Sequence, residues 1–116
     1  MLQILHNPRC GKSRNCLVFL NDANIQFEII DYIKNPLTAL EIKTMLKKLN
    51  LKPLELVRQK ETIWIDNYKG KLLNDEAIIS AIATYPILME RPIIIDGEEA
   101  IIGREAVKIK DFLTNN

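Results

Sequence analysis

Cys10 is the residue whose type and surroundings point most directly to covalent chemistry. It lies in the stretch HNPRCGKSRN at residues 6–15, between a short apolar segment and a predicted helix. A sulfur at the start of a helix faces unpaired N–H groups and the positive end of the helix dipole, which favours the thiolate. Arg9, Lys12 and Arg14 add positive charge that lowers a thiol pKa and attracts an oxyanion. The pattern predicts a nucleophilic thiolate at an anion site; a small buried cysteine is the alternative.

Arginine usage gives a second indication of anion binding. The chain has eleven lysines but five arginines, and the three that lie away from Cys10 are Arg58, Arg91 and Arg104. Each is predicted in a loop or at the boundary of an element. Because the planar guanidinium binds tetrahedral oxyanions through two donors, these three could form a clamp. Ordinary surface ion pairs are the alternative.

The other candidate groups define what kind of thiol chemistry is possible. Cys16 lies about 600° of helical turn beyond Cys10 and precedes an apolar run, so we expect it in the core. Ser13 occupies the position where a Cys-x2-Cys motif has its second thiol, which implies that an external thiol is needed. His6, the single histidine, either tunes the thiolate or is a half-buried strand-end residue bonded to backbone.

Spacing excludes three other kinds of site. A phosphate-binding loop of the Gly-x4-Gly-Lys-Ser type needs glycine where His6 stands. A Cys-x5-Arg phosphatase motif needs arginine where Cys16 stands. One histidine and two poorly spaced cysteines provide no set of metal ligands, so we expect no metal site.

The elements that must position these residues alternate between strand and helix. In chain order the patterns predict a strand at 2–6, a helix from Gly11, a strand over 25–29, a helix at 39–49 with a Thr38/Glu41 capping box, irregular short turns over 51–73, a helix at 75–84 capped by Asn74, a hairpin over 92–102 with the turn pair Asp96-Gly97, and a last helix opened by Gly103. This order predicts an α/β fold: a mixed sheet built from a βαβ unit and then a ββα unit, with helical segments between them.

Composition sets the class of protein. The chain has 116 residues, 47% of them hydrophobic, and a net charge of +1, which fits one globular domain over 1–116 with a helical insertion at about 38–85. The near-neutral charge gives no field for direct nucleic-acid binding. Without a long apolar stretch or a secretory signal, we expect no membrane association and a cytoplasmic location.

Three motifs together resemble the glutaredoxin-dependent arsenate reductase family. They are HNPRCGKSRN at 6–15, Leu56-Val57-Arg58, and PILMERPIII at 86–95, and the resemblance covers nearly the whole chain in order. It implies a thioredoxin-like fold with a helical insertion. It also implies that Cys10 is the catalytic cysteine, that Arg58, Arg91 and Arg104 bind the oxyanion, and that Pro92 is the cis-proline of the fold. His6, Ser13 and Arg14 would support the site.

The implied reaction is reduction of arsenate to arsenite through a single thiolate. Glutathione would be the reductant and glutaredoxin the protein partner, with no bound cofactor. Two alternatives stay open: a general glutathione-linked thiol oxidoreductase, and a redox-responsive transcription regulator that binds RNA polymerase. Such regulators share the fold but use a Cys-x2-Cys switch, which Ser13 does not provide.

Overall fold

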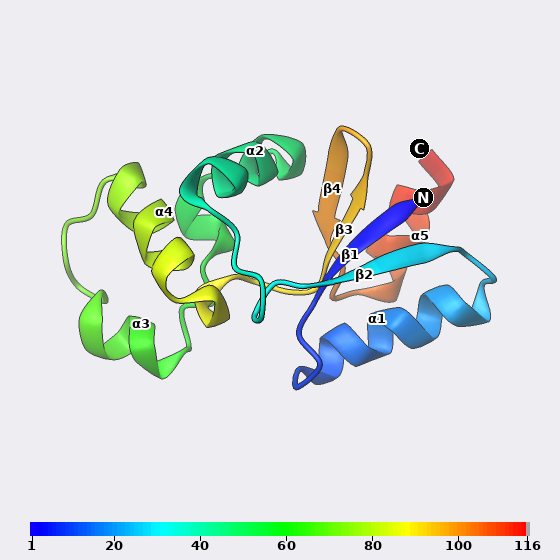
Figure 1. Cartoon of the computed structure of the whole chain (residues 1–116), viewed down its shortest axis with the longest axis horizontal. Helices are drawn as coiled ribbons and strands as arrows, with labels where there is room; N and C mark the ends of the chain where they lie inside the picture. The colour runs from blue at the N-terminus through cyan, green and yellow to red at the C-terminus, as the bar shows by residue number, and fades with distance from the viewer. Residues whose placement is uncertain (116) are drawn as a thin grey trace. The chain divides into compact units, whose positions relative to one another are not determined.

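A computed structural model describes residues 1–115, and it divides the chain into two compact units. The first combines Met1–Asn35 with the chain from Arg91 onward, and the second is Pro36–Glu90. The first unit contains the sheet and the second contains helices alone among its regular elements (Figure 1). That residues 1–116 form one domain stays a prediction.

The sheet has four strands in the order β2-β1-β3-β4. These are β1 (Leu2–His6), β2 (Phe27–Asp31), β3 (Ile93–Asp96) and β4 (Glu99–Ile102). Strand β1 pairs in parallel with β2, whereas the pairs β1/β3 and β3/β4 are antiparallel. With helix α1 (Gly11–Asp22) after β1 and helix α5 (Ala106–Asn115) after β4, this confirms the predicted α/β class, a thioredoxin-like mixed sheet built from a βαβ unit and a ββα unit.

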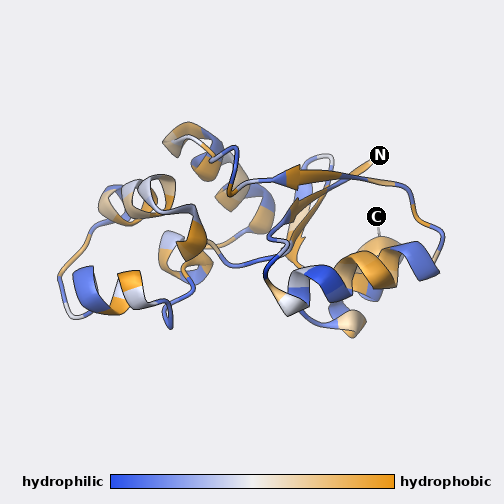
Figure 2. Cartoon of the chain, turned by 60° about the horizontal axis from the view of Figure 1, so that its bottom comes forward, coloured by the Kyte–Doolittle hydropathy of each residue, from blue (hydrophilic) through white to orange (hydrophobic). Residues whose placement is uncertain are grey.

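Two helices, α1 (Gly11–Asp22) and α5 (Ala106–Asn115), supply side chains to one apolar core with the sheet. Figure 2 shows how strongly hydrophobic residues are concentrated in the strands. The buried members of this core cluster are Leu2, Ile4, Cys16, Leu20, Ile94 and Ile109. Burial of these side chains is the main stabilising term for the unit, at about 25 cal/mol per Å² of apolar surface.

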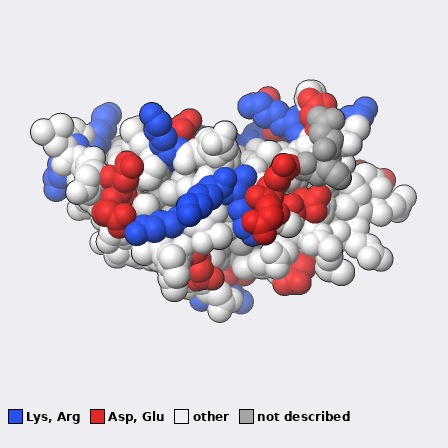
Figure 3. All heavy atoms as spheres, turned by 90° about the horizontal axis from the view of Figure 1, so that it is seen from above, with Lys and Arg blue, Asp and Glu red and all other residues white. Residues whose placement is uncertain are grey.

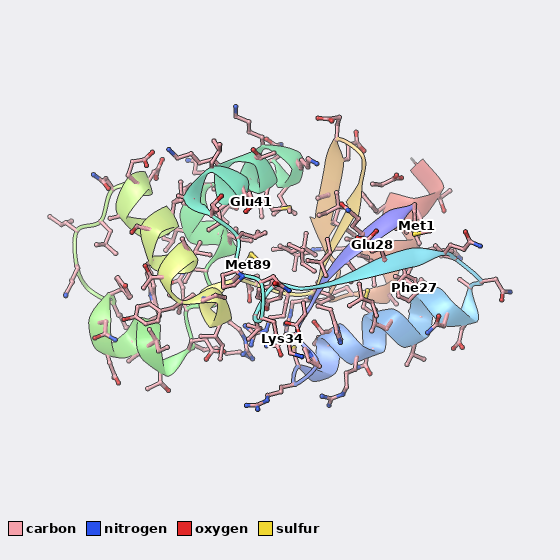
Figure 4. The ribbon with its side chains drawn as sticks, in the orientation of Figure 1. Met1, Phe27, Glu28, Lys34, Glu41 and Met89 are labelled. Atoms are coloured by element: carbon pink, nitrogen blue, oxygen red, sulfur yellow. The ribbon has the colours of Figure 1, made fainter. Side chains whose placement is uncertain are left out.

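Strand β2 differs from its prediction because it lies at the edge of the sheet. The strand begins at Phe27, and Ile25 precedes it, although Ile25 still packs against the core. Phe27 and Glu28, labelled in Figure 4, are half-buried and exposed respectively. Ile29 should be as buried as Phe27 by alternation, but half of it is exposed, since an edge strand has a neighbour on one side only.

The hairpin is where it was predicted, but its turn is one residue further along. Asp96 still pairs with Glu99, so the two connecting residues are Gly97 and Glu98 rather than Asp96 and Gly97. Gly97 has φ +63°, a value that glycine adopts without a steric penalty. A two-residue connection with a positive φ suits the twist of the paired strands.

The prediction that Gly103 opens the last helix is wrong, because α5 begins at Ala106. Instead its N–H donates to the carbonyl of Pro92 at 2.8 Å. A Cβ placed on Gly103 would lie 2.9 Å from Cδ1 and 3.2 Å from Cγ1 of Ile94, whose side chain is fully buried. Glycine is therefore required here for close packing.

Gly103→Ala should lower the free energy of unfolding by about 1–3 kcal/mol, because the added methyl group overpacks a filled core. Urea unfolding followed by circular dichroism measures this. Gly11→Ala is the matched control: the nearest atom to its Cβ would be Arg14 Nη2 at 3.8 Å, an ordinary contact, so its stability should be unchanged or slightly raised. Equal effects of the two substitutions would contradict the packing argument.

The second unit consists of α2 (Ala39–Leu49), η1 (Pro53–Leu56), α3 (Thr62–Asn67), α4 (Asp75–Thr84) and η2 (Pro86–Leu88). The capping box is confirmed: the N–H of Glu41 donates to Thr38 Oγ1 at 3.1 Å, and the N–H of Thr38 donates to Glu41 Oε1 at 2.9 Å. Glu41 is labelled in Figure 4 at the first turn of α2. Asn74 caps α4 as predicted, by accepting from the N–H of Ala77 at 2.8 Å.

The stretch 51–73, predicted as irregular with short helical turns, contains η1 and the six-residue helix α3. Trp64 is buried in α3 and stacks on Tyr68 with 5.3 Å between ring centroids. Across residues 1–115, no helix is both long enough and apolar enough to cross a membrane.

Candidate functional site

The topology of the sheet brings three segments that are distant in sequence to one edge. Leu5, near the end of β1, pairs with Ile93 at the start of β3, and Ile93 pairs with Ile102 at the end of β4. The loop after β1, the residues before β3 and the residues after β4 therefore meet there. These segments carry Cys10, Arg91 and Arg104.

Cys10 is held by a hydrogen-bonded loop between β1 and α1. The N–H of Cys10 donates to the carbonyl of Asn7 at 3.0 Å, and its carbonyl accepts from the N–H of Arg14 at 3.0 Å. Cys10 has extended backbone angles (φ −93°, ψ 123°) and is the N-cap residue of α1. Its sulfur is therefore placed at the N-terminus of the helix, as the sequence predicted.

The surroundings of the sulfur favour its charged form. Partial burial raises the pKa of the Cys10 thiol, but the N–H groups of Ser13 and Lys12, together with a hydrogen bond and the positive charge from Arg91, outweigh burial and lower the pKa below its ordinary value. Cys10 is half-buried, so a small reagent can reach it. A lowered pKa and access together describe a reactive thiol.

Cys16 has the opposite environment and confirms the prediction that it belongs to the core. Only 2% of it is exposed, and burial raises the pKa of its thiol to about 11. It packs in the same cluster as Ile94 and Leu20. The two cysteines of the chain therefore differ in both protonation and access.

In the native protein at pH 7, iodoacetamide should alkylate Cys10 much faster than Cys16. The rate at Cys10 should reach its plateau at a lower pH than the rate of an unfolded-chain cysteine, because a lowered pKa moves the thiolate population to lower pH. Mass spectrometry of peptides after timed alkylation measures both sites. In urea the two cysteines should react at similar rates, and equal rates in the native protein would contradict the assignment.

Arg91 supplies the positive charge beside Cys10, and Arg104 is hydrogen-bonded to the backbone of Arg91. Arg91 is only 3% exposed, and its guanidinium hydrogen-bonds the Cys10 sulfur. Arg104 is half-buried, and its Nη1 donates to the carbonyl of Arg91 at 3.1 Å. The Arg91–Pro92 peptide bond is cis, as the resemblance implied for Pro92. Two of the three predicted arginines thus lie in the same unit as the thiol.

Arg58 belongs to the second unit. It is half-buried and forms an ion pair through Nη1 with Glu61 Oε1, three residues further on. Its backbone N–H donates to the carbonyl of Leu88 at 2.7 Å, next to the Val57/Met89 bridge. The backbone around Arg58 is thus fixed by hydrogen bonds within the unit. Its role at an oxyanion site stays a prediction.

The positive charges of Arg9, Lys12 and Arg14 were predicted to lower the pKa of the Cys10 thiol, but the structure gives these residues other roles. Among the described residues, the groups that lower the pKa of Cys10 do not include the side chain of Arg9, Lys12 or Arg14. Lys12 contributes through its backbone N–H. The side chain of Arg14 donates from Nη1 to the carbonyl of Pro8 at 2.9 Å, which ties it to the loop.

His6 lies at the end of β1 and is buried, with 7% exposed. Burial lowers the pKa of its imidazole, and of two smaller effects the Asp31 carboxylate raises it and Arg14 lowers it. The neutral ring is therefore favoured. Its Nδ1 is buried without a hydrogen-bond partner among the described residues, and His6 is not one of the groups that shift the pKa of Cys10.

Asn7 is the site residue that the sequence analysis missed. It is 5% exposed and contributes its backbone N–H, its carbonyl and its side-chain Oδ1 to the loop around Cys10. The signal was present in the Asn7-Pro8 dipeptide, since asparagine often bonds the backbone two residues on.

The surface carries both signs of charge. Figure 3 shows lysine and arginine side chains interspersed with aspartate and glutamate on one face of the molecule, consistent with the net charge of +1. Within residues 1–115 no three histidine, cysteine, aspartate or glutamate side chains are grouped so that they could hold a metal ion.

Comparison with known proteins finds one family and a consistent set of relatives. Residues 5–112 match the model of the ArsC family. The chain is 36% identical to the uncharacterized protein YfgD of Escherichia coli over 97% of this chain and 96% of that one, and 34% identical to an arsenate reductase of Neisseria meningitidis over 97% of each. The solved structure of an arsenate reductase from Vibrio cholerae superposes with a TM-score of 0.88 at 31% identity, covering 95% of both chains.

Proposed function

Because this chain belongs to the ArsC family, we propose that it is an arsenate reductase in which the Cys10 thiolate attacks arsenate. The observation that carries the proposal is the sulfur of Cys10 at the N-terminus of α1, next to two backbone N–H groups and the guanidinium of Arg91. This arrangement supplies a nucleophile and a positive site for oxyanion oxygens together. The names of the relatives from Neisseria and Vibrio support the substrate.

In the first step the Cys10 thiolate forms a bond to As(V), and one arsenate oxygen leaves as water after protonation. Arg91 and Arg104 balance the negative charge on the remaining oxygens, and the resemblance adds Arg58 as a third arginine. Ser13 supports the sulfur through its N–H, while its buried Oγ accepts from the N–H of Asn7 at 3.3 Å. Loss of water requires no resident metal or cofactor.

Reduction then requires external thiols, because Cys16 is buried in the core and does not serve as a resolving thiol. Glutathione condenses with the Cys10 adduct and a second water leaves. A glutaredoxin thiolate attacks the glutathione sulfur; the electron pair of the sulfur–arsenic bond passes to arsenic, giving As(III) and a glutaredoxin–glutathione disulfide. Water releases arsenite from Cys10, and a second glutathione regenerates glutaredoxin. A reaction driven by glutathione also supports the proposed cytoplasmic location.

The test is arsenate-dependent oxidation of NADPH in the presence of glutathione, glutathione reductase and glutaredoxin. We expect a rate that requires arsenate, glutathione and glutaredoxin together. Substitution of thioredoxin and thioredoxin reductase for the glutathione system should give no rate. A rate with thioredoxin alone would overturn the proposed electron donor, and no rate with either system would overturn the substrate.

A general glutathione-linked oxidoreductase is the second candidate, supported by the access of reagents to the low-pKa thiol of Cys10. The same assay with a glutathione mixed disulfide in place of arsenate distinguishes the two functions. Rapid turnover of the disulfide without turnover of arsenate would favour the second candidate.

A further inference from the structure

We propose that Asn7 is a positioning residue that holds Cys10 in the backbone conformation in which its sulfur meets the N–H groups of Lys12 and Ser13. The inference rests on the proposed function of Cys10 as the nucleophile. It concerns a residue that touches neither the sulfur nor the proposed substrate in any described contact.

Asn7 is linked to three separate residues of the loop and helix. Its side-chain Oδ1 accepts from the N–H of Arg9 at 3.0 Å, which closes a turn over Pro8. Its carbonyl accepts from the N–H of Cys10 at 3.0 Å. Its N–H donates to Ser13 Oγ at 3.3 Å, and Ser13 is completely buried. These bonds tie the end of β1 to the first turn of α1, with Cys10 between them.

The loop needs this support because the side chain of Cys10 does not hold the backbone of Cys10 in place as an ordinary N-cap side chain does. An ordinary N-cap residue accepts a hydrogen bond from the N–H of N2 or N3 and so locks its own backbone. Cys10 makes no side-chain capping bond of that geometry, although the N–H groups of Lys12 and Ser13 act on its sulfur. The backbone angles of Cys10 are therefore set by its neighbours, and the side chain of Asn7 fixes the residue directly before it, Arg9.

Asparagine meets two requirements at this buried position. Its amide oxygen accepts the N–H of Arg9, which would otherwise lose its side-chain partner. It also carries no charge, whereas aspartate would place a negative charge near the thiolate and disfavour it. Serine keeps a short acceptor that forms the same kind of turn more weakly.

The experiment compares Asn7→Ala, Asn7→Ser and Asn7→Asp with the matched control Asn21→Ala, an exposed asparagine in the last turn of α1. The readout is the rate of iodoacetamide alkylation at Cys10 against pH, followed by peptide mass spectrometry. Thermal unfolding of each variant is measured in parallel. This readout needs no arsenate, so it tests Asn7 even if the chain does not reduce arsenate.

We expect Asn7→Ala to move the midpoint of the alkylation profile to higher pH by about one unit, which is a roughly tenfold loss of thiolate below the pKa. Asn7→Asp should move it at least as far. Asn7→Ser should restore part of the shift, and Asn21→Ala should match the wild type. If Asn7→Ala does not fold, the Asn7→Ser midpoint decides.

A wild-type midpoint in folded Asn7→Ala, or in Asn7→Ser where Asn7→Ala does not fold, would overturn the proposal, even if the variant were less stable. A purely structural role predicts a change in melting temperature alone. The wild-type protein could fail to reduce arsenate while the Asn7 variants show the expected midpoint shifts. That result would overturn the proposed substrate and support the positioning role of Asn7.

Discussion

Cys10→Ser should reduce arsenate turnover to background, a loss on the order of 10⁴-fold or more, because removal of a covalent nucleophile leaves only the binding contribution of the site. A serine hydroxyl at this position is not ionised near neutral pH, whereas the pKa of the Cys10 thiol is lowered. The coupled NADPH assay measures the loss, with circular dichroism to show that the variant folds.

Cys16→Ser is the matched control for that variant. It should keep most of the activity, because Cys16 is buried in the core and has a pKa of about 11. A hydroxyl placed in this apolar cluster should lower the free energy of unfolding by about 1–3 kcal/mol. If Cys16→Ser were folded yet as inactive as Cys10→Ser, the single-thiol mechanism would be wrong.

Arg91→Lys should lower kcat/KM for arsenate by about 100-fold, because lysine keeps the positive charge and loses the planar pair of donors. Arg91 is suited to show this difference: it is 3% exposed and hydrogen-bonds the Cys10 sulfur. We expect much of the nucleophilicity of Cys10 to survive, since the charge that lowers its pKa remains. Steady-state kinetics with arsenate, beside alkylation of Cys10, separates oxyanion binding from thiol activation.

The control for Arg91→Lys is Arg9→Lys, at an exposed position in the loop that carries Cys10. This substitution should leave kinetics and stability close to wild type. Unchanged kcat and KM in Arg91→Lys would show that the guanidinium is not part of the oxyanion site. A large loss of stability without a kinetic change would assign Arg91 to folding.

The starts of several helices could be predicted from the sequence, because they depend on residues close together in the chain. The capping box of Thr38 and Glu41 fixes the start of α2, and Asn74 fixes the start of α4, because each signal is a hydrogen bond between residues three apart. The position of Cys10 at the start of α1 followed from the same kind of reasoning. These features do not depend on the rest of the fold.

Features that depend on tertiary packing could not be predicted from local sequence patterns. The role of Gly103 depends on Ile94, which lies on a neighbouring strand, so the sequence around Gly103 resembled a helix start. Arg9, Lys12 and Arg14 are close to Cys10 in sequence. The arginine whose charge acts on the sulfur is nevertheless Arg91, which lies before β3. The family resemblance predicted Arg91 and Arg104 at the site, and the pairing of β1 with β3 explains why Arg91 meets Cys10. Arg104 is hydrogen-bonded to the carbonyl of Arg91.

The pairing of β1 with β3 also has a consequence for the order of events while the chain is being made. Cys10 emerges from the ribosome early, but the guanidinium that activates it emerges only after the whole second unit. At about 5–20 residues per second, about 4–16 s separate the synthesis of Cys10 from that of Arg91. During that interval β1 lacks its antiparallel partner, and the thiol lacks Arg91. We therefore expect the nascent chain to present a less reactive cysteine until the residues from Arg91 onward have been made and have folded against β1.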